Sequence, residues 1–253
     1  MLCFGAGPAL GIPTLQLYSP GAIYDEATES WVTWANPFEL WVVGARSPEW
    51  VHMISQVTLL VGITPEYWAP FADDPGAFIR IQSTTSTRGL GPDLNPVSLD
   101  KILTVANLTS VDQNGDPMPG MPDDYGVYAG NFPGHDTYPA YFWAVGLSDL
   151  LIELWQEDVY DFGPSFDLTN PPSTAPDVGD VQYYSISYQP YTYEFMFEID
   201  LIGYAHNGSS QWRFAPFSHN ADAHSPEPGT ALLLGTALAG LGMGLVRRRK
   251  HQS

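Results

Sequence analysis

YEFMFEIDLIGY, residues 193–204, alternates apolar and acidic side chains more regularly than any other stretch of the chain. Successive side chains of a β-strand point to opposite faces, so a period of two predicts a strand with one face in a core and the other in water. The apolar set on the expected core face is Phe195, Phe197, Ile199 and Leu201. The acids Glu198 and Asp200 fall on the expected water face.

Other short runs of β-branched and aromatic residues, each bounded by Gly or Pro, also read as strands. They cover residues 14–18, 31–34, 38–43, 52–63, 78–82 and 181–188. We expect 181–188 and 193–204 to form an antiparallel hairpin, whereas 147–156 suits either a helix or a strand. Around 52–63, one face is predicted to carry Val51, Met53, Val57, Leu59 and Val61.

The order of these elements predicts the fold class. Short strands follow one another with Gly and Pro between them, and no alternation of strands and helices is visible. This pattern predicts an all-β antiparallel β-sandwich, jelly-roll-like, over residues 12–219 as one domain. We expect residues 220–225 to be a linker.

The charge of the chain argues against one class of partner. It has 28 acidic and nine basic residues, a net charge of −19, and only five of the basic residues precede residue 226. Such a surface repels phosphate backbones and anionic lipid, so we expect no binding to nucleic acid. It suits divalent cations, basic partners or neutral glycans. Cys3 is the only cysteine, so no internal disulfide is possible.

The last 28 residues, 226–253, have three parts. Pro226, Glu227 and Pro228 are followed by 18 uncharged residues, 229–246. As a helix these extend about 27 Å, just enough for a hydrocarbon core of about 30 Å. We therefore expect a transmembrane helix over 229–246, with a cytoplasmic basic tail over 247–250. A helix buried in a soluble core is the alternative. The basic tail consists of Arg247, Arg248, Arg249 and Lys250.

This order of Pro-Glu-Pro, apolar span and basic end resembles the PEP-CTERM sorting signal of exported proteins from Gram-negative, often exopolysaccharide-making bacteria. The resemblance implies cleavage near Pro226–Pro228 by an exosortase, a membrane-embedded cysteine transpeptidase-like enzyme. The protein would then be anchored transiently in the inner membrane and passed to the cell surface or the extracellular matrix. An exported chain needs an export signal, so we read residues 1–11 as the remnant of a signal peptide whose basic start lies upstream. An ordinary disordered N-terminus is the alternative.

Three further segments carry a second resemblance. They are IPTLQLY at 12–18 with GAIYD at 21–25, PFELWVVGA at 37–45, and FAPFSHNA at 214–221. Together they resemble the exported bacterial choice-of-anchor proteins, N type, in which a common ectodomain is joined to different sorting tails. The resemblance implies a surface or extracellular protein and supplies no catalytic residues.

DQNGD at 112–116 has the spacing of a calcium loop. Oxygen ligands two residues apart can point into one turn, and Gly115 permits the bend. The ligands would be Asp112, Asn114 and Asp116, completed by Asp123 and Asp124, and the ion would be structural. The alternative is a solvated Asn-Gly turn.

Two other groups of polar residues have weaker signals. His219, Asp222 and His224 have a spacing that suits a transition metal, but the expected linker is a poor scaffold. The carboxylate pairs Glu153 with Glu157 and Glu198 with Asp200 allow a glycosidase reading. An amphipathic strand places the second pair in the same way, and we expect no enzyme.

The eight Trp and 14 Tyr residues are numerous enough to allow carbohydrate binding as well as core packing. Trp41 and Trp155 are the candidates for stacking on sugar rings. The sequence thus predicts an exported, exosortase-sorted surface or matrix protein with a structural or adhesive role, associated with exopolysaccharide or a biofilm. The alternatives are a calcium-dependent carbohydrate-binding module and, more distantly, a glycan-degrading enzyme.

Overall fold

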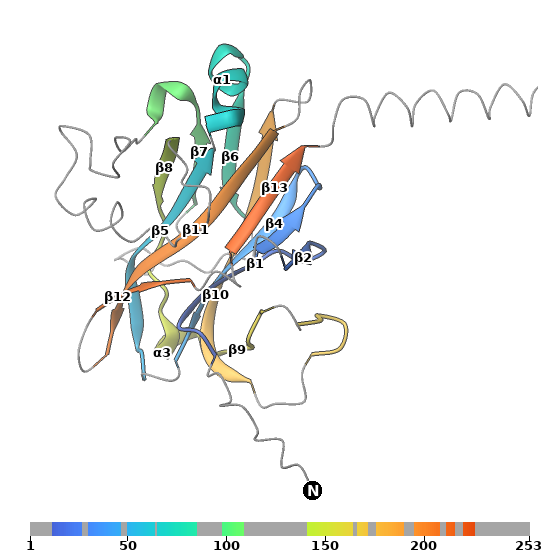
Figure 1. The fold of residues 1–253 in the computed structure, drawn as a ribbon. Coiled ribbons are helices and arrows are strands. Elements are labelled where there is room, and N and C mark those ends of the chain that lie inside the picture. The colour runs from blue at the N-terminus through green and yellow to red at the C-terminus, as the bar shows by residue number, and fades with distance from the viewer. Residues whose placement is uncertain are drawn as a thin grey trace, which may run out of the picture.

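The computed structural model of the 253-residue chain describes residues 12–26, 30–46, 50–63, 65–84, 98–108, 141–163, 166–171, 176–189, 195–207, 211–215 and 220–225. These segments are mostly β-strand and form two sheets (Figure 1). Pairing is antiparallel except between β3 and β13. The predicted all-β class is confirmed, and the two sheets are compatible with a β-sandwich.

Sheet A has the strand order β1-β4-β10-β6-β7, and β9 also pairs with β10. The long strand β10 therefore joins β4, β6 and β9. The strands are β1 (Leu15–Tyr18), β4 (Phe38–Ala45), β6 (Phe78–Ser83), β7 (Asp100–Leu103), β9 (Glu157–Val159) and β10 (Asp177–Gln189).

Sheet B has the order β2-β3-β13-β11-β5-β8, and β12 also pairs with β11. Its strands are β2 (Ile23–Asp25), β3 (Ser30–Thr33), β5 (Met53–Ile63), β8 (Tyr141–Gly146), β11 (Phe195–His206), β12 (Gln211–Phe214) and β13 (Asn220–Ser225). The pairing of β13 with both β3 and β11 places the last described strand inside the sheet.

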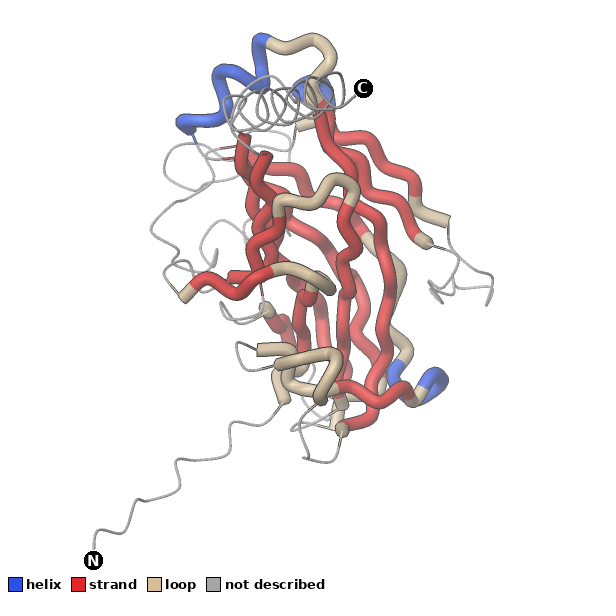
Figure 2. Tube along the Cα trace, turned by 90° about the vertical axis from the view of Figure 1, so that its right-hand side faces the viewer, coloured by secondary structure: helices blue, strands red, loops and turns tan. Residues whose placement is uncertain are grey.

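The helices in the described part of the chain are short. They are α1 (Pro65–Asp73), the 3-10 turn η1 (Val105–Asn107) and α3 (Ile152–Trp155). Helical segments lie at the ends of the sheets, not across their faces (Figure 2).

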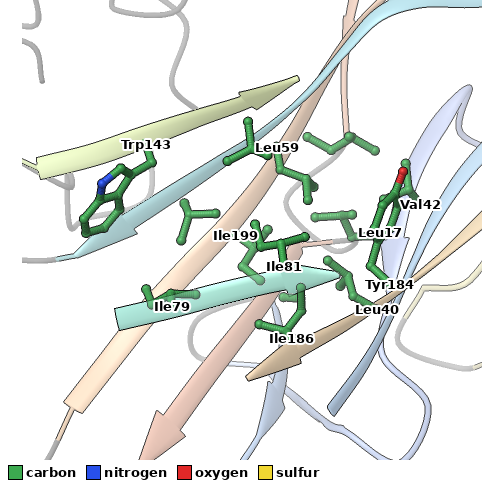
Figure 3. Close-up of a cluster of buried hydrophobic side chains, with 14 of the residues drawn as sticks. Leu17, Leu40, Val42, Leu59, Ile79, Ile81, Trp143, Tyr184, Ile186 and Ile199 are labelled. Atoms are coloured by element: carbon green, nitrogen blue, oxygen red, sulfur yellow. The ribbon is translucent and has the colours of Figure 1, made fainter. Parts of the chain in front are cut away.

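The main core lies between the two sheets (Figure 3). Alternate side chains of β4 and β10, such as Leu40 and Ile186, meet alternate side chains of β5 and β11, such as Leu59 and Ile199. The predicted core face of residues 193–204 is confirmed at all four positions, because each of these side chains is at most 1% exposed. Burial of so many apolar side chains is the dominant stabilising term.

Strand β5 departs from simple alternation at Gln56. Gln56 has a φ of 53°, and the register with β11 shifts between Ile202 and Tyr204. A β-bulge adds one residue to a strand, so side chains before and after it exchange faces. Ile54 therefore joins the core together with Val57, whereas Met53 is only half-buried. The prediction that Met53 shares the core face was wrong for this reason.

Two predicted connections also need correction. β10 and β11 do not form a hairpin, because β10 belongs to sheet A and β11 to sheet B. Each strand buries its own apolar face in the core between the sheets, so the chain crosses from one sheet to the other. Residues 220–225, expected as a linker, form strand β13, in which Ala221 and Ala223 face the core. The described β domain therefore extends past residue 219, to Ser225.

Candidate functional site

The outer face of sheet A carries a second cluster of aromatic side chains. Trp41 of β4 lies opposite Tyr18 of β1 on one side and Tyr183 of β10 on the other, so the three share one row across the sheet. We call these three residues the aromatic row. Phe162, which follows β9, stacks on Tyr18 with ring centroids 5.1 Å apart and covers that end of the row.

Trp41, one of the two predicted stacking residues, lies within β4 and is half-buried. Its ring packs nearly perpendicular to those of Tyr18, Phe162 and Tyr183, at centroid distances of 5.4, 5.9 and 5.2 Å. Its Nε1 donates a hydrogen bond of 2.6 Å to Oε1 of exposed Glu39. Neighbours on several sides thus fix the ring while part of it remains at the surface.

A line of hydrogen-bonding side chains lies beside the aromatic row. Glu39 pairs with Ser185, Ser185 with Gln82, and Gln82 with Asp100, on the four adjacent strands β4, β10, β6 and β7. We call these four residues the polar row. Glu39 and Asp100 are exposed, and Gln82 and Ser185 are half-buried. Adjacent strands are about 4.8 Å apart, so the row spans about 14 Å.

Arg80 orders one end of the polar row. Its Nε and Nη2 donate to the two carboxylate oxygens of Asp100 at 2.8 and 2.7 Å. This two-point hydrogen bond lowers the pKa of Asp100, and a hydrogen bond from Gln82 lowers it further. Paired guanidinium and carboxylate groups hold one another in a defined plane. The sheet therefore presents fixed donors and acceptors at its surface.

Trp155, the second predicted stacking residue, is the last residue of α3 and is half-buried. The helix lies at the opposite end of the sheets from α1 (Figure 1). Trp155 is therefore on a helix at one end of the sheets, and Trp41 is on a strand of sheet A. Trp41 and Trp155 therefore do not lie side by side on adjacent strands.

The carboxylates of β11 are arranged differently from the sequence prediction. Asp200, expected in water, is only 5% exposed, and Glu198 is half-buried. Glu198 lies directly opposite Asp222 of β13, which is also 5% exposed. Two acids of sheet B, Asp200 of β11 and Asp222 of β13, are therefore withdrawn from solvent.

Asp222 is held by a hydrogen bond from Oγ of Ser30 on the neighbouring strand β3. Burial raises the pKa of Asp222 from 3.8 to about 6; the Ser30 hydrogen bond opposes this shift, and the charge of Asp25 adds to it. His224 has a lowered pKa, mainly because it is partly buried. Among the residues that the structure describes, no three His, Cys, Asp or Glu side chains form a metal-binding group.

Several predicted site residues lie outside the described residues. These are the calcium candidates Asp112, Asn114, Asp116, Asp123 and Asp124, and the sorting residues Pro226, Glu227, Pro228, Arg247, Arg248, Arg249 and Lys250. His219 of the transition-metal reading and the expected signal-peptide remnant over 1–11 are outside them as well. Within the described segments, no helix is long and apolar enough to cross a membrane, and the span expected at 229–246 is not among them.

Comparisons with known proteins give no information about the chemistry of this site. No family model matches the chain, and no curated protein matches it. The solved structure of AvmM, which catalyses macrocyclization in alchivemycin A biosynthesis, aligns with 85% of this chain and 89% of that chain. The identity is 9% and the TM-score is 0.34. A similarity of this degree supports no inference about fold or function.

The polar row was not visible in the sequence. The alternation in FIRIQS, residues 78–83, places Arg80 and Gln82 on one face, and the run was recognised as a strand. Their neighbours Ser185 and Asp100 come from strands elsewhere in the chain, and only the register of the sheet brings them together. Of the residues on this face, the sequence points to Trp41 as a stacking residue and to Glu157 as one of a carboxylate pair.

Proposed function

We propose that this protein is an exported, exosortase-sorted surface or matrix protein with a structural or adhesive role. The observation that carries the proposal is the three-part order of residues 226–253, a Pro-Glu-Pro motif, an uncharged span and a basic end. The described β domain is consistent with it, because β13 ends at Ser225, directly before Pro226. Cleavage within residues 226–228 would release the domain with every described strand intact.

The finer architecture belongs to the same proposal. The ectodomain is a jelly-roll-like β-sandwich related to the choice-of-anchor proteins, and residues 229–246 are its transient inner-membrane helix. The expected partners are the exosortase, the inner membrane and exopolysaccharide. In support, core side chains of both sheets meet between them, and strands distant in sequence, such as β3 and β13, are neighbours.

Mass spectrometry of the protein recovered from the medium or cell surface of the producing bacterium tests the sorting. We expect C-terminal peptides that end within residues 226–228 and none that contain Arg247. Glu227→Ala should leave the tail attached. Glu66→Ala, which removes one exposed acid from α1, is the matched control and should be processed like the natural chain. A mature protein that still ends at Ser253 contradicts the proposal.

A carbohydrate contact is the second candidate function, and the outer face of sheet A favours it. Half-buried aromatic rings lie beside ordered hydrogen-bonding groups there, and this combination is common in small-molecule binding sites. No ion is needed at the polar row, so this candidate does not depend on the calcium loop.

A further inference from the structure

We propose that the outer face of sheet A binds a neutral polysaccharide along the aromatic row and the polar row. The inference deepens the proposed function, because it gives the adhesive role a ligand class and a site. It rests on the arrangement of described residues on β1, β4, β10, β6 and β7, and not on the sorting tail.

The aromatic row supplies the apolar contact. Sugar rings have apolar faces formed by C–H groups, and Trp and Tyr offer large rigid surfaces that lose little entropy on binding. Trp41 and Tyr183 are both half-exposed and adjacent, with centroids 5.2 Å apart. The packing of Tyr18 and Phe162 against Trp41 holds its ring before any ligand arrives, which lowers the cost of binding.

The polar row supplies the hydroxyl partners. A sugar hydroxyl both donates and accepts, so a site for it needs both kinds of group. Glu39 and Asp100 accept, while Ser185 and Gln82 do both. Because the four lie in register on adjacent strands, they offer a ladder of contacts about 14 Å long across the sheet. That shape suits an extended chain of several sugar units.

The charge of the face disfavours an anionic ligand. Asp100 is paired with Arg80, while one carboxylate oxygen of Glu39 accepts a hydrogen bond from Nε1 of Trp41. Glu157 adds a further acid beside Tyr183, whose hydroxyl lies 3.4 Å from it. The acids Glu39 and Glu157 and the net charge of −19 over the whole chain would repel an acidic polysaccharide. A polyhydroxyl ligand without charge avoids that repulsion.

Affinity electrophoresis of the full-length chain tests the site. The gels contain hydroxyethylcellulose, dextran or galactomannan as neutral probes and alginate as the anionic probe. We expect at least one neutral probe to retard the protein and alginate to have no effect. Gln82→Ala should weaken binding to the active probe by about tenfold, the value of one good hydrogen bond. Trp41→Ala should abolish the retardation.

Two comparisons separate binding from folding. Gln82→Ala alters a half-exposed side chain, so its melting temperature should match that of the natural chain even if Trp41→Ala is less stable. Trp50→Ala removes a Trp that is 68% exposed and belongs to neither row, so this variant should bind normally. The proposal is overturned if no neutral probe retards the protein, if alginate retards it most, or if Gln82→Ala binds unchanged.

A second copy of the chain is the competing occupant of the face. Light scattering that shows a dimer dissociated by Gln82→Ala would assign the face to self-association and overturn the proposal. Sorting is measured separately at residues 226–228, so either proposal can fail while the other stands.

Discussion

Replacement of Asp222 by Asn should make the protein more stable at neutral pH, although it removes a hydrogen-bonded side chain. The carboxyl is 5% exposed, accepts a hydrogen bond from Ser30 and lies opposite Glu198 on β11. Its burial disfavours the ionised form, because a charge loses hydration that one neutral donor does not replace. Asn keeps the shape and an acceptor for Ser30 without the charge.

The size of the effect follows from the pKa of Asp222, which rises from 3.8 to about 6 in the folded protein. Each pKa unit corresponds to about 1.4 kcal/mol, so ionisation of the folded state costs about 3 kcal/mol more than ionisation of the unfolded state. Below about pH 4 both states are protonated and nothing is lost. Between about pH 4 and 6 only the unfolded state ionises, and the free energy of unfolding falls. Above about pH 6 the loss is complete and constant.

Urea denaturation at several pH values between 3.5 and 8 measures this difference directly. The stability of Asp222→Asn minus that of the natural chain should rise by about 3 kcal/mol between about pH 4 and 7, and then level off. The subtraction cancels the titration of all other groups. Asp158→Asn removes one acid from an exposed position on β9 and controls for the change in net charge.

A difference that is flat with pH would refute the reasoning, because it would mean that the buried carboxyl is solvated or compensated. A variant less stable than the natural chain at pH 7.5 would show that the charged form is favoured by its surroundings. Either result would also show that burial of Asp222 on β13 does not disfavour its ionised form.

Three further predictions concern the core, the sheet and the metal. Phe197→Ala should lower the free energy of unfolding, measured by urea titration, by about 3–5 kcal/mol, because loss of its fully buried ring leaves a cavity between the sheets. The control is Ile102→Ala, at a position that is 49% exposed, which should change the free energy of unfolding little. Gly179→Ala should lower the melting temperature measured by calorimetry, because a Cβ at this position would lie 2.3 Å from the carbonyl oxygen of Gly44 on β4. Gly146→Ala is the matched control, because a Cβ at Gly146 has no atom within 4 Å. If the loop at 112–124 binds structural calcium, EDTA should lower the melting temperature of the natural chain but not that of Asp116→Asn; an unchanged melting temperature after chelation contradicts the calcium site.

Much of the local structure could be read from the sequence. The strands Phe38–Ala45, Phe78–Ser83 and Phe195–His206 match the expected runs to within a few residues. Alternation indicates the last strand, and β-branched and aromatic residues bounded by Gly or Pro indicate the other two. Strands without a clear period were missed. β13 is one, since NADAHS has only two small apolar side chains and reads as a polar connection.

The candidate site was less predictable. Trp41 was chosen for its residue type, but its fixed orientation depends on Tyr18 and Phe162 from distant parts of the chain. The polar row has no signature at all in the sequence. Its members are separated by long stretches of chain and become neighbours only because β10 pairs with β4 and β6 in a specific register.

By itself the sequence determined the β class, the core faces of the regular strands, the acidic charge and the three-part tail, because each depends on residues close together in the chain. The tertiary structure alone decided that β10 and β11 belong to opposite sheets, that the bulge at Gln56 exchanges the faces of β5, and that Asp200 and Asp222 are buried. The physical reason is that pairing and register minimise the free energy of the whole core. A strand's pattern says which face is buried, but not which strands lie beside it.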